Sequence, residues 1–510
     1  MDLENAEKNR KVIPRLRDFK TTLILGELHS PVRGGVINNI FLNASVEDEL
    51  EAWENNRTLS FATDLVGSGF VLGLTDAVQE AADFILSDES ATDLQKKIAK
   101  QAKNPEYCAH LTSVQEVLPD SSELINHSQK QVRKFRQEPR QSPRNPIKIV
   151  ELAREYATLG SIRKALRAMD TAVALAPANR FVLRSATRLY VHAGEIDKAH
   201  FILRRAPSLR SDPWLLAAEI AVASLRNQTS RHINVGLKQI ANTNYNPFDV
   251  SELASAIATL EMENAKSRVA RKLFGQALRR PTENSIAQAE WASHSIASFD
   301  IDMHDFNVPR NFEALASDFY QKGEWELAID QGKSWILDQP FALSPVIFTG
   351  TTASVIDDFD LSEKIYKFGL GANPDNTVLR NNLAYVLASN NLPEEAEKEL
   401  FLIERSMLSV GEKIITTATE GLIKFRKGLH EEGRQLYRNA IKIAQDNNEP
   451  GYALRALAFL AREEITAGTE YAEKTYIVAE SEAKRFQPTQ ELNILFNKLR
   501  TLFQNSLNHL

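Results

Sequence analysis

Two stretches of the sequence decide the fold: YATLGSIRKA at residues 156–165 and YVHAGEIDKA at residues 190–199. They place three residue pairs 34 positions apart, namely Tyr156 and Tyr190, Gly160 and Gly194, and Ala165 and Ala199. A period of 34 residues is typical of stacked helical hairpins. The chain is therefore expected to form an extended surface for contact, an architecture that requires no catalytic pocket.

Each repeated residue type has a physical reason to stand where it does. Gly160 suits the left-handed conformation that ends a helix. Ala165 is small enough to let two helices approach closely, and Tyr156 fills the space between them. The pattern predicts a first array of hairpins over residues 146–299, a loop over 300–309 that lacks helical periodicity, and a second array over 310–510 with C-terminal capping helices. Pro340 and Pro374 repeat the interval in the second array.

The composition is that of an ordinary soluble protein. The 510 residues are 43% hydrophobic and 25% charged, and the net charge is −6. This mild charge gives no global reason to expect binding to nucleic acid or to an anionic membrane. A single cysteine, Cys108, excludes an internal disulfide framework and a multi-thiolate metal site. No secretory signal or membrane-spanning stretch is visible, so a cytoplasmic location is expected.

These hairpins resemble tetratricopeptide repeats. The resemblance implies an all-α solenoid, a right-handed superhelix whose concave groove is lined by the first helix of each hairpin. Counting from the hairpin starts places Arg154, Arg184 and Arg188 on that face, and Asn381 and Tyr385 in the second array. Arginines there suit an acidic or C-terminal peptide, whereas the asparagine and the tyrosine suit a peptide backbone and an aromatic cover. The alternative is that the arginines pair with neighbouring glutamates.

The same family has a carboxylate clamp for chaperone tails, which uses lysine and asparagine at set inward positions. Those positions hold Val150, Arg154 and Ser185 in this sequence. This departure argues against a role as a chaperone partner.

The first 145 residues carry a weaker pattern. Residues 1–120 are expected to be mostly helical, with a degenerate hairpin over Phe61–Leu86 and either a short strand or an apolar anchor at Thr21–Leu25. Residues 121–145 are interpreted as a basic linker. Its candidate contacts with nucleic acid are Lys130, Arg133, Lys134 and Arg136. The alternative is a solvated segment that pairs with the acidic solenoid.

No motif points to catalysis, a cofactor or a metal. The segment with Asp300, Asp302, His304 and Asp305 lacks the glycine and the distal glutamate of a calcium loop, so a solvated acidic turn is expected. The glycine-rich stretches lack the ending of a phosphate-binding loop. We therefore expect neither a metal site nor a cofactor.

Three hypotheses of function follow. The first is a non-enzymatic scaffold or adaptor subunit of a soluble complex, which binds a partner protein or peptide segment in the groove. The second is an adaptor associated with RNA or DNA, which uses the basic linker and the groove arginines. The third is an enzyme whose site lies in residues 1–120, although this region carries no recognisable catalytic motif.

Overall fold

The computed structural model describes residues 10–17, 19, 53–72, 75–103, 121–137, 145–242, 245–301, 303–485 and 490–508. These residues form 24 α-helices and no strand, which confirms the predicted all-α solenoid. Residues 21–25, for which a strand or an anchor was predicted, lie outside the described part. Among the described residues, no helix is both long enough and apolar enough to cross a membrane.

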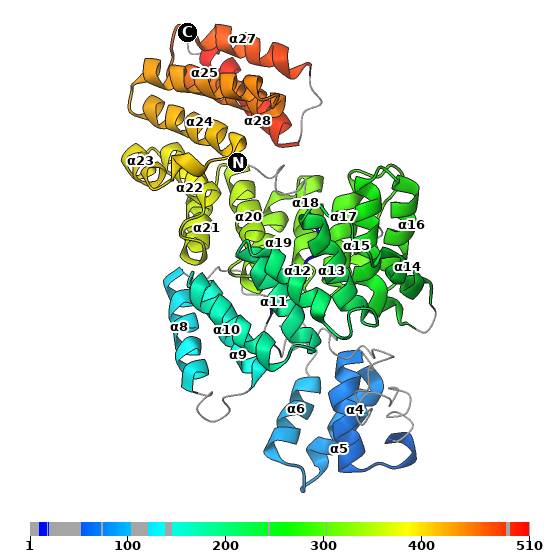
Figure 1. The fold of residues 1–510 in the computed structure, drawn as a ribbon. Coiled ribbons are helices and arrows are strands. Elements are labelled where there is room, and N and C mark those ends of the chain that lie inside the picture. Colours follow the sequence, from blue (N-terminus) through cyan, green and yellow to red (C-terminus); the bar gives the residue numbers. More distant parts are fainter. Residues whose placement is uncertain are drawn as a thin grey trace.

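The N-terminal helices form a small cluster below the first array (Figure 1). They are α4 (Leu59–Leu72), α5 (Thr75–Ser87) and α6 (Asp93–Lys103). Their core contains Trp53, Leu65 and Ile85, all at most 1% exposed. The degenerate hairpin predicted for Phe61–Leu86 therefore corresponds to α4 and α5.

The segment interpreted as a basic linker is mostly helix, and this interpretation was wrong for residues 121–137. Helix α8 (Ser121–Gln137) packs against α9 (Pro146–Thr158). Val132 of α8 is buried in the large core of the first array, which explains why the segment is helical. Of the prolines at 139, 143 and 146 that indicated a linker, Pro146 begins the first turn of α9, and the other two lie outside the described residues.

The first array continues as antiparallel helix pairs. Its helices are α10 (Ile162–Leu175), α11 (Arg180–His192), α12 (Ile196–Arg205), α13 (Pro213–Leu225), α14 (Ile233–Ala241), α15 (Pro247–Glu263), α16 (Ser267–Ala277) and α17 (Glu283–Ser293). Asparagine or aspartate caps four of the first helices through its side chain: Asn145, Asn179, Asp212 and Asn246.

The second array begins after a 3₁₀ turn at Met303–Phe306, within the predicted loop. Its helices are α18 (Phe312–Lys322), α19 (Trp325–Asp338), α20 (Leu343–Val355), α21 (Phe359–Ala372), α22 (Thr377–Ser389), α23 (Pro393–Phe401), α24 (Val410–Arg426), α25 (His430–Asp446), α26 (Pro450–Thr466), α27 (Ala472–Ala483) and α28 (Gln490–Asn508).

The repeated residues act as the sequence predicts. Gly160 and Gly194 have φ angles of 65° and 78°, in the left-handed region. Ala165 is fully buried, and Tyr156 and Tyr190 are 9% and 1% exposed. Residue size and backbone freedom at these positions therefore fix the shape of the hairpins.

The two arrays form one continuous stack that curves back on itself (Figure 1). Helix α17 packs against α18, and a cluster with Ile286, Phe306 and Ala314 spans the junction. Helix α9 also contacts α21, two hundred residues later in the chain. There, an ideal Cβ on Gly160 would lie 2.9 Å from the carbonyl oxygen of Gly371, so this contact requires glycine.

Candidate functional site

A non-helical segment of the chain itself, Arg10–Arg17, lies against the first helices of the first array. Val12 and Leu16 of this segment are 3% and 0% exposed and belong to the core of that array. The Asn284 amide donates to the Ile13 carbonyl over 3.4 Å, so the segment is held by its backbone as well as by its side chains.

Every basic side chain of this segment pairs with an acid that lies more than 250 residues away. Arg10 and Arg15 pair with Glu313, and Lys11 pairs with Glu263. Arg17 pairs with Glu283 and with Asp338, which its Nη2 reaches over 2.7 Å. The four basic residues thereby connect α15, α17, α18 and α19.

Asp338 is the centre of this ion network. Its side chain is completely buried, and it accepts hydrogen bonds from Arg17 and, over 2.9 Å, from Arg310 Nε. Burial disfavours the charged carboxylate, but Arg17, Arg310 and Arg15 outweigh it and lower the pKa of Asp338 to about 2. The acids on these four helices are therefore already paired with a basic segment of the same chain.

Arg184 is not available to a partner, so the predicted open arginine groove is wrong at this position. The residue is 3% exposed. Its Nη2 donates to Glu252 Oε2 of α15 over 2.9 Å, and its Nη1 donates to the Trp214 carbonyl of α13 over 3.1 Å. Its guanidinium also lies 5.0 Å from the centre of the Trp214 ring. Arg184 is therefore part of the core of the array.

The other two predicted groove arginines are half-buried. Arg188 lies over the ring of Phe341 at 5.8 Å, and burial together with the charge of Arg15 lowers its pKa to about 10 despite the opposing effect of Glu313. Arg154 pairs with its neighbour Glu155 over 3.1 Å.

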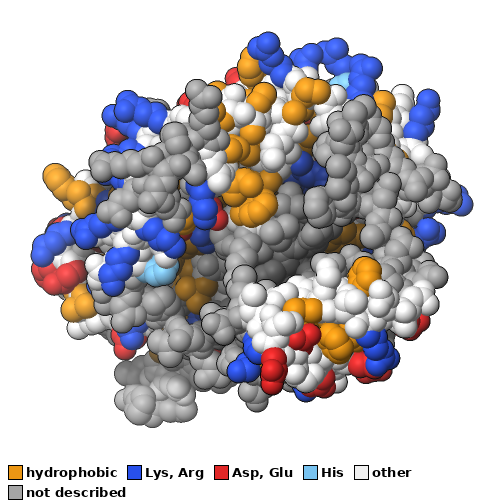
Figure 2. All heavy atoms as spheres, turned by 90° about the horizontal axis from the view of Figure 1, so that it is seen from below, with side chains coloured by type: hydrophobic (Ala, Val, Ile, Leu, Met, Phe, Trp, Pro, Cys, Tyr) orange, Lys and Arg blue, Asp and Glu red, His pale blue; other side chains and the backbone are white. Residues whose placement is uncertain are grey.

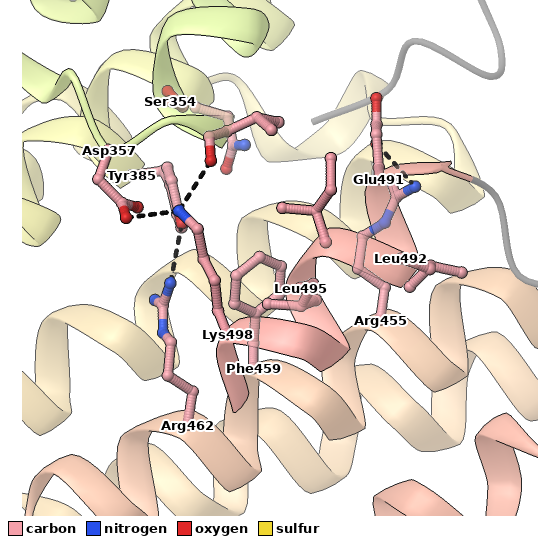
Figure 3. Close-up of a pocket in the computed structure, with 13 residues that line it drawn as sticks. Ser354, Asp357, Tyr385, Arg455, Phe459, Arg462, Glu491, Leu492, Leu495 and Lys498 are labelled. Atoms are coloured by element: carbon pink, nitrogen blue, oxygen red, sulfur yellow. Dashed lines mark hydrogen bonds and ion pairs between the residues drawn. The ribbon is translucent and has the colours of Figure 1, made fainter. Parts of the chain in front are cut away.

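The other two predicted contacts, Asn381 and Tyr385 of α22, line one cavity together (Figure 3). Its volume is about 80 Å³, enough for a side chain but not for a nucleotide or a haem. The walls come from the end of α20, from α22 and α26, and from the C-terminal helix α28, which crosses the inner face of the second array. Apolar walls are provided by Val355, Phe459, Leu492, Ile494 and Leu495.

Asn381 has an unused acceptor in this cavity. The residue is 2% exposed, and its Nδ2 donates to Asn382 over 3.4 Å. Its Oδ1 is buried and has no hydrogen-bond partner within the described residues. A buried polar atom without a partner costs free energy that a ligand donor would recover.

Tyr385 stands between two aromatic rings, 6.5 Å from Phe359 and 5.7 Å from Phe459. Its hydroxyl accepts a hydrogen bond from Arg462 over 3.1 Å, which fixes the ring in place. On the other side, Lys498 of α28 donates to the Val355 carbonyl over 2.7 Å and pairs with Asp357, as Figure 3 shows. The cavity therefore has a rigid aromatic wall and a rim fixed by ion pairs.

The remaining predicted residues lie elsewhere. Lys130, Arg133, Lys134 and Arg136 are exposed on α8, away from the cavity residues. Asp302 and the side chain of His304 lie outside the described part. Among the described residues, no group of three or more His, Cys, Asp or Glu side chains is placed to hold a metal ion.

Sequence reasoning missed the contributions of the two chain ends. Arg17 and α28 lie outside the repeat pattern, so periodicity says nothing about them. The only sign of this contact in the sequence was the concentration of basic residues in Arg10–Arg17. The predicted groove was expected to carry arginines as well, so no contact between the two was expected.

The fold and the repeated glycines, alanines and tyrosines define a helical-repeat protein built of stacked helical hairpins. Among solved structures, the chain is similar to yeast Tom70, with 13% identity over 75% of this chain and 96% of that one and a TM-score of 0.32. It is also similar to a tetratricopeptide repeat protein from Parabacteroides merdae, with 12% identity over 58% of this chain and 93% of that one and a TM-score of 0.24. No protein-family model and no curated protein matches the sequence.

Proposed function

We propose that this protein is an interaction scaffold that binds an extended segment of a partner protein in the cavity between α20, α22, α26 and α28. The observation that carries the proposal is Asn381, a residue that lines a mostly apolar cavity and whose buried Oδ1 has no partner within the described residues. A backbone N–H of a peptide supplies the missing donor, and an apolar side chain fills the remaining space.

The chemistry of the walls favours an apolar anchor residue. The basic groups at the rim already have partners: Arg455 pairs with Glu491 over 3.2 Å, Arg462 with Glu463 and Lys498 with Asp357. An acidic peptide would have to compete with these carboxylates. The acidic ligand expected from Arg154, Arg184 and Arg188 is therefore replaced by a peptide with an apolar side chain.

The test is selection of short peptides from a phage-displayed random library, followed by calorimetric titration. Asn381→Leu removes the acceptor at similar volume, and Asn439→Leu makes the same change at an exposed position of α25. Selected peptides should share an apolar residue and lose at least about fivefold in affinity with the first variant only, because one lost buried hydrogen bond costs about 1–3 kcal/mol.

Circular dichroism checks that both variants keep the helix content of the parent chain. Equal affinities for the parent and for Asn381→Leu would show that the peptide does not bind in this cavity. Failure to select any peptide would contradict the proposed peptide recognition itself.

A further inference from the structure

The outer surface of the first array is basic, although the whole chain is acidic. Residues 146–299 carry 21 Lys and Arg against 13 Asp and Glu, whereas the chain as a whole carries 61 against 67. Several of these acids are buried inside the array, including Asp212, Glu219 and Glu252. The charge is unevenly distributed in the space-filling view as well, where Lys and Arg predominate along the upper edge and acids are more numerous along the lower edge (Figure 2).

Three exposed arginines lie near enough to His232 for their charges to act on it. Arg204 lies in the last turn of α12, Arg210 in the loop before α13, and Arg231 in the loop before α14. None of the three makes an ion pair within the described residues. All three act on the buried His232: burial lowers its pKa most, Glu219 opposes this as the next largest effect, and Arg210, Arg231 and Arg204 each lower it further.

Local structure does not account for this arrangement. A cation in the last turn of a helix is favoured by the helix dipole, which explains Arg204 and its neighbour Arg205. Arg210 and Arg231 lie outside helices and gain nothing from that effect. The nearby Glu219 is already engaged by Ser230 Oγ over 2.5 Å and by His200 over 3.1 Å. Three like charges therefore remain without a counter-charge, and a bound anion would relieve their repulsion.

An exposed aromatic ring lies beside the arginines on the same helix. Phe201 is 57% exposed, and the guanidinium of Arg205 lies 5.1 Å from the centre of its ring. Phe201, Arg204 and Arg205 are spaced by three and four residues, which places them on one face of α12. A site for single-stranded nucleic acid has two parts: basic groups that contact the phosphate backbone, and an aromatic ring on which a base stacks.

We propose that the surface formed by Phe201, Arg204, Arg205, Arg210 and Arg231 binds single-stranded nucleic acid. The arginines contact successive phosphates, and the exposed ring of Phe201 stacks on an unpaired base. A duplex presents its phosphates but not its base faces, so single strands are preferred. This surface lies on α12 and on the loops before α13 and α14, and none of its residues lines the cavity proposed for the peptide.

The probe is a fluorescently labelled oligouridylate, whose binding to the full chain is measured by anisotropy over a range of salt concentrations. The triple variant Arg204→Gln, Arg210→Gln, Arg231→Gln should bind at least about tenfold more weakly and should reduce the slope of log K against log salt by about 2, because each phosphate contact on a single strand contributes about 0.7. Phe201→Ala should weaken binding about tenfold through lost stacking.

Matched controls come from the same chain. The triple variant Lys130→Gln, Arg133→Gln, Arg136→Gln removes the same charge from exposed positions of α8. Phe401→Ala removes an 88% exposed ring from the second array. Both controls should bind the oligouridylate like the parent chain.

Four results would overturn the proposal: no binding by the parent chain, equal loss with the α8 control, equal binding of Phe201→Ala and the parent, or equal affinity for a duplex of the same length. Vesicles of phosphatidylcholine and phosphatidylserine are the remaining comparison. Capture by these vesicles through the same arginines, without binding to the oligouridylate, would assign the surface to a membrane and reject nucleic acid.

Discussion

Replacement of Asp338 by alanine should open the junction between the two arrays. The side chain of Asp338 is completely buried and accepts hydrogen bonds from both Arg17 and Arg310. Removal of one partner from a buried ion pair typically costs about 3–5 kcal/mol, because the opposite charge stays buried without compensation. Arg17 keeps Glu283 as a partner, so the lower end of this range, about 3 kcal/mol, is the expected loss.

Hydrogen exchange followed by mass spectrometry measures this loss locally. About 3 kcal/mol corresponds to a rise of about a hundredfold in the exchange of amides in α19 and in Arg10–Arg17. Asp330→Asn is the control, since Asp330 lies on the same helix but its side chain is 54% exposed and pairs only with Lys333 in the next turn. It should change exchange by less than about threefold. A similarly small effect of Asp338→Ala would refute the reasoning that this network ties the N-terminal segment to the array.

Three further outcomes are expected. Arg184→Ala should lower the free energy of unfolding by about 3 kcal/mol in urea titrations, because it removes the cation that pairs with the buried Glu252, whereas a loss under about 0.5 kcal/mol would show that the residue is exposed. Acid should destabilise the chain between about pH 4 and pH 2, because the stabilisation from the lowered pKa of Asp338 is complete above the unfolded pKa and is lost as the pH falls through the folded pKa. Acid titrations of Asp338→Asn should lack this contribution of about 2 kcal/mol. Gly160→Ala should lower the melting temperature more than Gly194→Ala, because both have positive φ but only the first meets a backbone oxygen at 2.9 Å, and equal shifts would contradict the contact between α9 and α21.

The hairpins could be predicted from the sequence because their determinants are local. Gly160 and Gly194 end helices by their own backbone freedom, and Ala165 packs within its own hairpin. Such signals lie within one period of the repeat, so one sequence is enough to read them.

The side chains that pair with one another across the fold could not be predicted, because they come from distant parts of the chain. Arg17 and Asp338 are 321 positions apart, and Arg184 finds Glu252 68 positions later. Periodicity placed Arg184 on a helix face but could not show that Glu252 and Trp214 fill the space around it. The same limit holds for α8, where helix formation depends on Val132 reaching the core of the array.

Asn381 and Tyr385 lie between these two cases. Their spacing of four residues predicts one shared helix face, and the structure places both in one cavity. The wall that makes this face a cavity is α28, which belongs to no repeat. The repeat pattern therefore predicts the residues that α22 contributes to this cavity, but not those that α28 contributes.

Hydrogen exchange with and without a selected peptide tests the central proposal most directly, because it locates the bound segment on the chain. We expect slower exchange at the end of α20 and in α22, α26 and α28, and clearly less slowing in the Asn381→Leu variant at a peptide concentration near the Kd of the parent chain. Protection confined to other helices, or equal protection of Asn381→Leu at this concentration, would contradict the proposed site.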